Sequence, residues 1–468
     1  MFNSKFRKAA GLLLFGGVIA ACNQSTKDKQ EADANVVRLI TVDPGHFHAA
    51  LVQKSMYPEV DSVVQVYAPA DGKDLQAHLG LINDYNNRET DPTHWKEEIY
   101  TGPDFLDKML KDRKGNVVVL AGNNKRKIDY ISSAIEGGFN VLADKPMVID
   151  KKGFSRLEKA FATANEKGVL LYDIMTERFE ITATLQRALS RDTSLFGKLE
   201  KGSLQEPAIT KESVHHFFKS VSGKPLIRPT WFFDVSQQGE GIVDVTTHLV
   251  DLVQWEGFPE QRIDYKKDIE VLNARRWATW VKKDEFKKAT NEDIPDSLKE
   301  QVNPAGDLGV YANGEINYKI KGVFAKVMVK WNFEAPEGAG DTHYSIMRGT
   351  KANLIIKQGP EEGYKPVLYI ELPKGNQNAN FDQSVQDAVK KLSGTYQNLQ
   401  VEKMKTGFYR LVIPEVYKTS HEEHFGQVTK NFLSYLEQNK LPDWEVPNML
   451  AKYYITTEAL SLAKKNKK

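Results

Sequence analysis

Two short segments of the chain carry side chains that can exchange protons with a substrate. Lys145 is followed directly by Pro146, and a following proline restricts the lysine backbone to an extended conformation. Further along the chain, Asp244 and His248 stand four residues apart, the spacing that places both side chains on one face of a helix. An amine and an imidazole can together remove the proton of a hydroxyl group and polarise the carbonyl that forms, and a carboxylate can hold the imidazole in one tautomer. These residues indicate acid–base chemistry at an alcohol or a carbonyl group.

Each segment also has an ordinary structural interpretation. The D-K-P sequence around Lys145 is common in turns. An aspartate four residues before a histidine more often forms a surface ion pair with it, or the histidine is a core residue whose nitrogens are hydrogen-bonded. Asp251 and Trp255 continue the helical face that begins at Asp244. Taken singly, neither segment is specific for catalysis.

Apolar, strand-like runs that alternate with helical patterns surround the lysine segment. The runs cover residues 36–42, 62–67, 116–122, 139–144 and 169–173. The helical patterns between them, such as those at 125–136 and 153–167, end at glycines, which supply the left-handed cap of a helix. This order is typical of an α/β fold. We therefore expect residues 36–173 to form a Rossmann-type, doubly wound parallel sheet with ligands at the carboxyl ends of its strands.

The pattern changes in the second part of the chain, residues 174–468. Longer strands with alternating apolar residues follow one another from 314 to 372, with turn residues between them. They predict an α+β domain with an open-faced, mostly antiparallel sheet, and the open face could support a homo-oligomer. Residues 373–420 are expected to be an insertion or a peripheral helix pair, and residues 425–463 are expected to be helical with a break at Pro442.

Two motifs resemble those of a known family. Residues 141–147, V-L-A-D-K-P-M, resemble the E-K-P signature of the Gfo/Idh/MocA oxidoreductases, the glucose-fructose oxidoreductase and inositol dehydrogenase family, with Asp144 in place of the usual glutamate. Residues 239–251 are similar to the family's G-G-G-x-x-x-D-x-x-x-H-x-x-D, and W-F-F-D at 231–234 precedes them as in the family. The resemblance extends over residues 36–350 and includes the order of the two domains.

The resemblance implies an oxidoreductase that uses NAD or NADP and acts on a secondary hydroxyl group of a sugar or glycoside. The residues to which it gives catalytic roles are Lys145, Asp244 and His248. It also places Arg178, Trp231 and Asp251 near the substrate. An interdomain salt bridge is the alternative for Arg178, and aromatic core packing is the alternative for Trp231.

The expected cofactor site departs from the family pattern. The family has G-x-G-x-x-G after its first strand, whereas residues 43–50 read D-P-G-H-F-H-A-A, with one glycine and a proline that removes a backbone donor. A helix that starts near His46 still offers its N-terminal N–H groups to a pyrophosphate. The residues expected to bind the cofactor are Gly45, His46, Phe47, Asn123, Asn124, Asp144, Lys145 and Pro146. The choice between NAD and NADP stays open because Asp71, the candidate for binding the ribose, comes several residues late.

Two histidine pairs raise the question of a metal. His46 and His48 could bind one, but the sequence shows no third ligand beside them, so no metal site is predicted. The segment H-E-E-H at 421–424 lacks the histidine spacing of H-E-x-x-H and is interpreted as a solvated helix start.

The N-terminus has the order of an export signal. Basic residues precede an apolar run at 9–21, which is too short to span a membrane. The run ends in I-A-A before Cys22, the single cysteine of the chain, and this resembles a bacterial lipobox. We expect a signal peptide at 1–21, a lipid anchor at Cys22, a flexible tether at 22–35 and a location in the bacterial cell envelope, with the membrane as a partner.

The composition excludes other classes of protein. Of the 468 residues, 41% are hydrophobic and 27% are charged, as in an ordinary globular protein. The 64 basic and 62 acidic residues nearly cancel, so we expect no nucleic-acid partner.

Two functions from different classes follow. The first is an NAD(P)-dependent sugar or glycoside oxidoreductase, or a related enzyme that oxidises, eliminates and reduces again with the same nicotinamide. Free nicotinamide cofactor is scarce outside the cytoplasm, so we expect a tightly bound cofactor that is regenerated within each cycle. The alternative is a lipid-anchored carbohydrate-binding module of the same fold without a cofactor, which the altered glycine turn favours.

Overall fold

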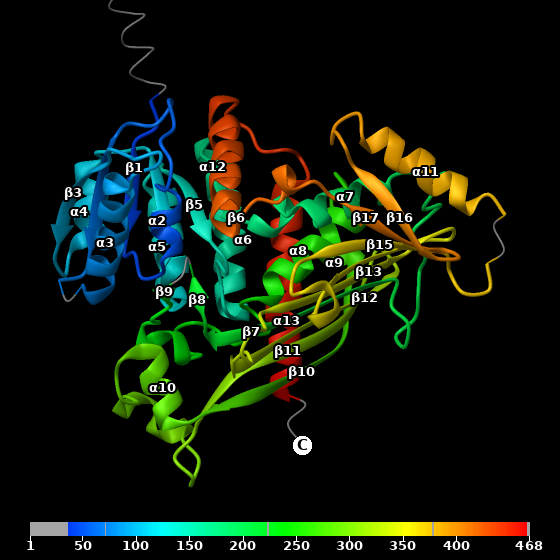
Figure 1. The fold of residues 1–468 in the computed structure, drawn as a ribbon. Coiled ribbons are helices and arrows are strands. Elements are labelled where there is room, and N and C mark those ends of the chain that lie inside the picture. Colours follow the sequence, from blue (N-terminus) through cyan, green and yellow to red (C-terminus); the bar gives the residue numbers. More distant parts are fainter. Residues whose placement is uncertain (1–35, 71, 222–223, 377–378, 466–468) are drawn as a thin grey trace, which may run out of the picture.

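The computed structural model describes residues 36–70, 72–221, 224–376 and 379–465. The predicted signal peptide, the tether and Cys22 lie outside the described residues. Figure 1 shows two main sheets, a smaller one in blue and cyan and a larger one in green, yellow and orange. Among the described helices, none has the length and apolar character needed to cross a membrane.

The smaller sheet has six parallel strands in the order β3-β2-β1-β4-β5-β6. The strands are β1 (Leu39–Val42), β2 (Val63–Ala68), β3 (Lys96–Thr101), β4 (Val117–Leu120), β5 (Asn140–Asp144) and β6 (Leu171–Ile174). The connecting helices are α2 (His48–Leu51), α3 (Lys73–Asn87), α4 (Phe105–Asp112), α5 (Asn124–Glu136) and α6 (Lys151–Lys167). The strand order reverses between β1 and β4, the point at which doubly wound sheets bind ligands. The predicted Rossmann-type sheet is confirmed.

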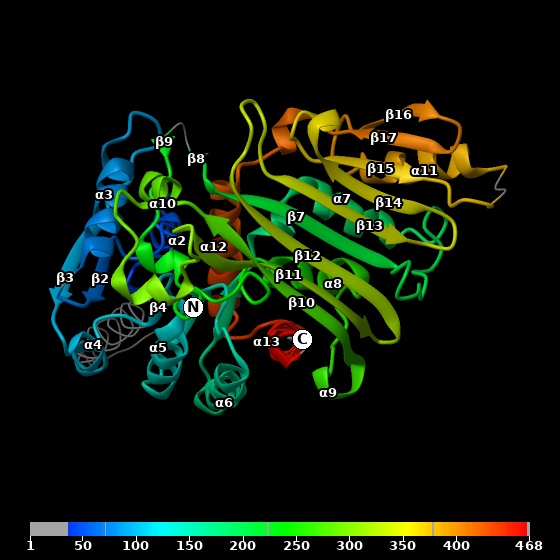
Figure 2. The same ribbon diagram turned by 90° about the horizontal axis from the view of Figure 1, so that it is seen from below.

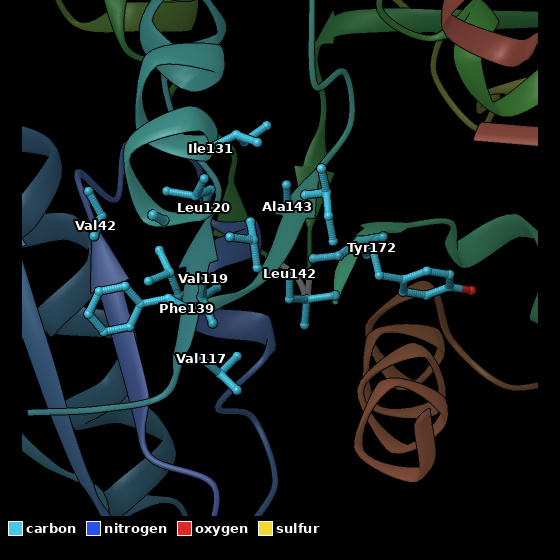
Figure 3. Packing of buried hydrophobic residues seen from close by; sticks show 14 of the residues in the cluster. Val42, Val117, Val119, Leu120, Ile131, Phe139, Leu142, Ala143 and Tyr172 are labelled. Carbon is cyan, nitrogen blue, oxygen red and sulfur yellow. The ribbon is translucent and has the colours of Figure 1, made fainter. Parts of the chain in front are cut away.

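Short runs of branched apolar residues form the core of this sheet. Figure 3 shows Val119 and Leu120 of β4 beside Leu142 of β5, with Ile131 of α5 in the same cluster. All four are at most 1% exposed. Burying one such side chain contributes about 1.5–3 kcal/mol, so the aligned valines and leucines stabilise the edge from which the site residues project.

The larger sheet has nine strands in the order β10-β11-β12-β7-β13-β14-β15-β17-β16 (Figure 2). They are β7 (Ile209–Phe218), β10 (Ile269–Val281), β11 (Leu308–Ile320), β12 (Val323–Glu334), β13 (Thr342–Arg348), β14 (Asn353–Gln358), β15 (Val367–Glu371), β16 (Gln400–Lys405) and β17 (Phe408–Val412). Strand β12 runs parallel to β7, and the other neighbouring pairs are antiparallel. The predicted mostly antiparallel sheet is confirmed. Smaller elements follow β7, namely the ribbon of β8 (Ser220–Val221) and β9 (Lys224–Pro225), α9 (Tyr265–Asp268) and α10 (Lys283–Thr290).

Helices cover one face of the larger sheet. They are α7 (Ile181–Ser190), α8 (Thr246–Gly257) and α13 (Glu445–Lys465). The opposite face carries ion pairs, for example Lys326 with Glu212 and Arg275 with Glu315, each at 2.8 Å. This face is the predicted open one, and its use in an oligomer stays a prediction.

Residues 373–420 differ from the expected helix pair. The described part of this segment contains one α-helix, α11 (Phe381–Leu392), a 3₁₀ turn at Glu415–Tyr417 and the β16–β17 hairpin, which extends the larger sheet beside β15. In β17, buried Tyr409 and Leu411 alternate with exposed Arg410 and Val412, the two-residue period of a strand with one buried face. The helix pair was therefore a wrong prediction.

Helix α12 (His421–Glu437) leaves the larger sheet and packs against the smaller one (Figure 1). Its Phe425, Val428 and Phe432 are buried in the core of the first domain. The ring of Phe432 stacks on Tyr172 of β6, with a centroid distance of 6.0 Å. Residues that sequence patterns assign to the second domain therefore complete the core of the first.

Candidate active site

A cavity of about 610 Å³ lies between the two sheets. Its walls come from the loop after β1, the end of β5, helix α8, strands β7, β12, β13 and β14, and the start of α12. The volume is in the range of small-molecule sites. Ionisable residues of the wall include His46, His48, Lys145, Glu177, His215, Asp244, His248, Asp341, His343 and His421. The cavity thus opens at the carboxyl edge of the first sheet, where the sequence predicted a ligand.

The two domains bring Lys145 and Asp244 together in the cavity wall. Lys145 follows the last residue of β5, and its peptide bond to Pro146 is cis. Its Nζ lies 2.6 Å from Asp244 Oδ1, and the side chains are only 11% and 6% exposed. The other oxygen of Asp244 accepts a hydrogen bond from Gln238 Nε2 at 2.9 Å. The lysine therefore faces the cavity with a fixed counter-ion, which sequence spacing did not predict.

His248 lies on α8 and also lines the cavity, but Asp244 does not orient it. Asp244 is in the turn before α8, and it bonds Lys145 and Gln238 instead. The Nδ1 atom of His248 is buried without a hydrogen-bond partner. Burial lowers the pKa of His248 well below 6.5, so the ring is neutral at pH 7. The predicted Asp244–His248 pair on one helical face is therefore wrong.

Further histidines reach the same wall from elements that are distant in sequence. His343 lies on β13 and His421 at the start of α12. Burial lowers the pKa of His343 to about 3 and that of His421 to about 4, so both rings can donate and accept hydrogen bonds as neutral groups. The solvated interpretation of this helix start is wrong for His424, which is 4% exposed. No sequence motif joins these histidines, because only the sheet topology brings them together.

Arg178 and Asp251 form a buried ion network and do not line the cavity. Arg178 Nε and Nη2 donate to the two carboxylate oxygens of Asp251 at 2.6 and 2.7 Å, and its Nη1 donates to Glu445 at 2.7 Å. Lys452 Nζ lies 2.8 Å from both Asp251 and Asp173. The network joins β6, α8 and α13. The pairs of Arg178 thus lie within the second domain, and the bridge that crosses to the first domain is Lys452 with Asp173. The structure does not place Arg178 or Asp251 at a substrate.

The C-terminal part of the chain, residues 185–464, matches the family model described as "Putative oxidoreductase C terminal domain". The chain belongs to this oxidoreductase family. A crystal structure of a putative oxidoreductase from Parabacteroides merdae has 55% sequence identity and a TM-score of 0.90, over 92% of this chain and 98% of that one. The family resemblance recognised in the sequence is confirmed.

More distant members of the fold are known with nucleotides. KijD10, a 3-ketoreductase from Actinomadura kijaniata solved with NADP and TDP-benzene, has 13% identity and a TM-score of 0.54, over 92% of this chain and 98% of that one. GenD2 from gentamicin A biosynthesis, solved with NAD, has 15% identity and a TM-score of 0.54, over 92% and 95%. These likenesses show the fold alone. A search of curated proteins finds no match.

The fold of this oxidoreductase family implies a nicotinamide dinucleotide at the switch point, and the loop after β1 does not fit one. The N–H groups of Gly45 and His46 both donate to the carbonyl oxygen of Ala121, each at 3.2 Å. The helix that follows, α2, has four residues. A pyrophosphate site needs outward-facing backbone donors at the start of a helix, and these two donors are already used.

Side chains also fill the crevice beside this loop. Trp231, in the 3₁₀ turn Thr230–Phe233, donates its indole N–H to Asp74 Oδ2 at 2.8 Å. A Cβ atom added to Gly45 would lie 3.2 Å from the Trp231 ring, and one added to Gly122 would lie 2.8 Å from the nitrogen of Gly45. The loops after β1 and β4 and the tryptophan are therefore in direct contact where a dinucleotide would pass.

Asn123 and Asn124 bind the second domain. Asn123 Nδ2 donates to Gln237 Oε1 at 2.7 Å, and Asn124 Nδ2 donates to the carbonyl oxygen of Gln238 at 2.7 Å. The cofactor roles expected for Gly45, Asn123 and Asn124 therefore stay predictions that require these contacts to open.

Of the other residues expected to bind the cofactor, His46, Phe47 and Lys145 line the cavity, whereas Asp144 and Pro146 are not among its lining residues. His48 Nδ1 is 2.9 Å from Asp144 Oδ2, and His46 Nδ1 is 4.0 Å from the same atom. The rings of the two histidines are in direct contact, with centroids 4.0 Å apart, and Phe47 packs against both, at 4.6 Å from His46 and 4.4 Å from His48. Burial lowers the pKa of both histidines well below 6.5. Asp144 is thus a third polar group beside this histidine pair, and the sequence did not connect it with the pair.

Proposed function

We propose that the protein is an enzyme that acts on a small polyhydroxylated molecule, a sugar or sugar derivative, in the cavity between its domains. Lys145 exchanges a proton with a hydroxyl or keto oxygen of this substrate, and Asp244 holds the lysine in position. The pairing of these two residues, one from each domain, at the wall of a ligand-sized cavity carries the proposal. A lysine with a fixed geometry and a counter-ion can act as an acid or a base for such an oxygen.

The lining of the cavity supports a substrate with many hydroxyl groups. Neutral histidines such as His215 and His343 and the amide of Gln358 offer donors and acceptors. Trp331, a buried ring that packs against Phe217, adds a small aromatic surface to the wall, where the apolar side of a sugar ring can make contact. KijD10, a protein of this fold, is a 3-ketoreductase, which supports a keto or hydroxyl oxygen as the reacting group.

Membership of an oxidoreductase family favours the interconversion of a hydroxyl and a keto group. KijD10 and GenD2 were solved with NADP and NAD, and this supports a nicotinamide as the redox partner. In this chain a dinucleotide would have to displace Trp231 from Asp74. The tightly bound, self-regenerating nicotinamide expected from the sequence therefore stays an untested hypothesis that these contacts disfavour.

The packed crevice predicts that the purified protein binds neither NAD⁺ nor NADP⁺ measurably. The reason is that a pyrophosphate would have to replace the Trp231–Asp74 hydrogen bond and the contact between the loops after β1 and β4. Isothermal titration calorimetry with both nucleotides, together with mass spectrometry of any nucleotide that co-purifies, measures this. Binding accompanied by a change in tryptophan fluorescence that is absent from Trp231→Phe would show that the crevice opens and would restore the nicotinamide hypothesis.

A panel of sugars and glycosides, incubated with the protein in D₂O, tests the proposed reaction. With NAD⁺ or NADP⁺ added as the hydride acceptor, oxidation of a hydroxyl group gives a product lighter by two hydrogens and one equivalent of reduced nicotinamide. Proton transfer at carbon needs no oxidant and introduces deuterium that NMR locates. Either result supports an enzyme. The second candidate, a carbohydrate-binding module without chemistry, is favoured by the filled crevice. It predicts sugar binding with no product and with no change in affinity for Lys145→Met.

A further inference from the structure

We propose that His46, His48 and Asp144 bind a divalent transition-metal ion at the place where the fold would otherwise hold the nicotinamide. Each residue offers one ligand atom, and the three atoms lie within 4.8 Å of one another. Two imidazole nitrogens and one carboxylate oxygen form a donor set that suits Zn²⁺ and Fe²⁺ better than Mg²⁺ or Ca²⁺.

The backbone of the first sheet holds the three metal-binding side chains close together. His46 and His48 follow β1, Asp144 is the last residue of β5, and β4 lies between these strands. The carbonyl oxygen of Asp144 accepts a hydrogen bond at 2.9 Å from Lys127, which is itself buried and fixes the end of β5. The side chains of His46, His48 and Asp144 are only 17%, 9% and 6% exposed, so the surrounding protein restricts their movement.

The cavity supplies the remaining coordination position. Both histidines line it, and so does Lys145, the residue after Asp144. Three protein ligands with one open position are typical of catalytic rather than structural metal sites. A metal there would polarise a substrate oxygen within reach of Lys145, whose positive charge is balanced by Asp244 at 2.6 Å. A metal ion is much smaller than a pyrophosphate, so it can bind at this cluster while the dinucleotide crevice stays packed.

The charge around the cluster also accommodates a cation. The carboxylate of Asp144 contacts the imidazoles of His46 and His48. The two neighbouring ammonium groups have other partners, because Lys127 bonds the backbone carbonyl of Asp144 and Lys145 pairs with Asp244.

The test is a titration of the chelator-treated, full-length protein with ZnCl₂, followed by calorimetry. Cobalt(II) serves as a second probe, because its visible absorption reports the ligands and geometry. We expect one equivalent of Zn²⁺ per chain. We also expect Asp144→Asn and His46→Ala each to weaken binding by more than about 100-fold, beyond the 10–100-fold usual for losing an outer hydrogen-bond partner.

The matched control is His94→Ala, which removes an exposed histidine outside the cavity and should leave zinc binding unchanged. Asp144→Asn keeps the size of the side chain, and circular dichroism of each metal-free variant establishes that it is folded. The proposal is overturned if the wild type takes up no zinc, or if folded Asp144→Asn and His46→Ala bind as tightly as the wild type. It is also overturned if His94→Ala loses the same affinity. None of these measurements needs a substrate, so the metal site and the proposed function can fail independently.

Discussion

Replacing Lys145 with methionine is expected to lower turnover of the cavity substrate by about 100-fold or more, the usual scale for removing an acid–base group. Methionine keeps the unbranched stem but carries no proton. Lys145 Nζ donates a hydrogen bond to Asp244 Oδ1, and the methionine side chain has no group that can donate a proton in its place. Rates measured with saturating substrate separate this effect on turnover from an effect on substrate affinity.

Two further variants make the result specific. Lys145→Met leaves the buried carboxylate of Asp244 without its cation, so the double variant with Asp244→Asn removes that destabilisation and should show the same loss of turnover. Lys152→Met changes an exposed lysine on α6 and should retain wild-type turnover. Turnover of folded Lys145→Met within a few-fold of wild type would contradict the role of Lys145.

Asp251→Ala is expected to lower the free energy of unfolding by about 3–5 kcal/mol, because it leaves two buried cations, Arg178 and Lys452, without their shared anion. Lys452 also pairs with Asp173 of β6, so the network joins the first domain to α8 and α13, and its loss weakens the contact between the two sheets. Urea unfolding followed by circular dichroism gives the change from the shift in midpoint at constant slope.

The pH dependence provides a separate check on Asp251. Burial alone would raise its pKa, but Arg178 and Lys452 hold the pKa well below its usual range. A carboxyl group with a depressed folded-state pKa stabilises the protein above its unfolded value of about 3.9 and loses this contribution as the pH falls further. The difference between Asp251→Ala and wild type should therefore be full at pH 7 and shrink below about pH 4. As a control, Asp129→Ala removes an exposed pair with Arg156 and should cost at most about 1 kcal/mol.

The buried strands of the first sheet were predictable from sequence, whereas strands with exposed or charged residues were not. Strands β1, β4 and β5 are buried on both faces and appear as continuous valine and leucine runs. Strand β3, K-E-E-I-Y-T, is an edge strand whose residues are mostly exposed, so its sequence has no such run. Strands β7 and β10 carry charged residues between the apolar ones and were also not recognised.

The residues of the candidate site were also only partly predictable from sequence. The motifs predicted that Lys145 and His248 would face one cavity, and both line it. They did not predict that Asp244 would pair with the lysine, since its helical spacing to His248 was the stronger local signal. The third member of the His46–His48 cluster, Asp144, is nearly a hundred positions away and becomes a neighbour only because β1 and β5 flank the same strand.

Helix α12 has a consequence for the order in which the chain can fold. The first domain buries Phe425, Val428 and Phe432 from the end of the chain, so residues 36–174 alone expose the surface that these side chains cover. Domains usually fold one after another as the ribosome releases them, with the N-terminal domain first. Here the N-terminal domain stays incomplete until almost the whole polypeptide has been made. A nascent chain of this kind remains open and accessible to targeting factors for longer than one whose first domain closes on its own.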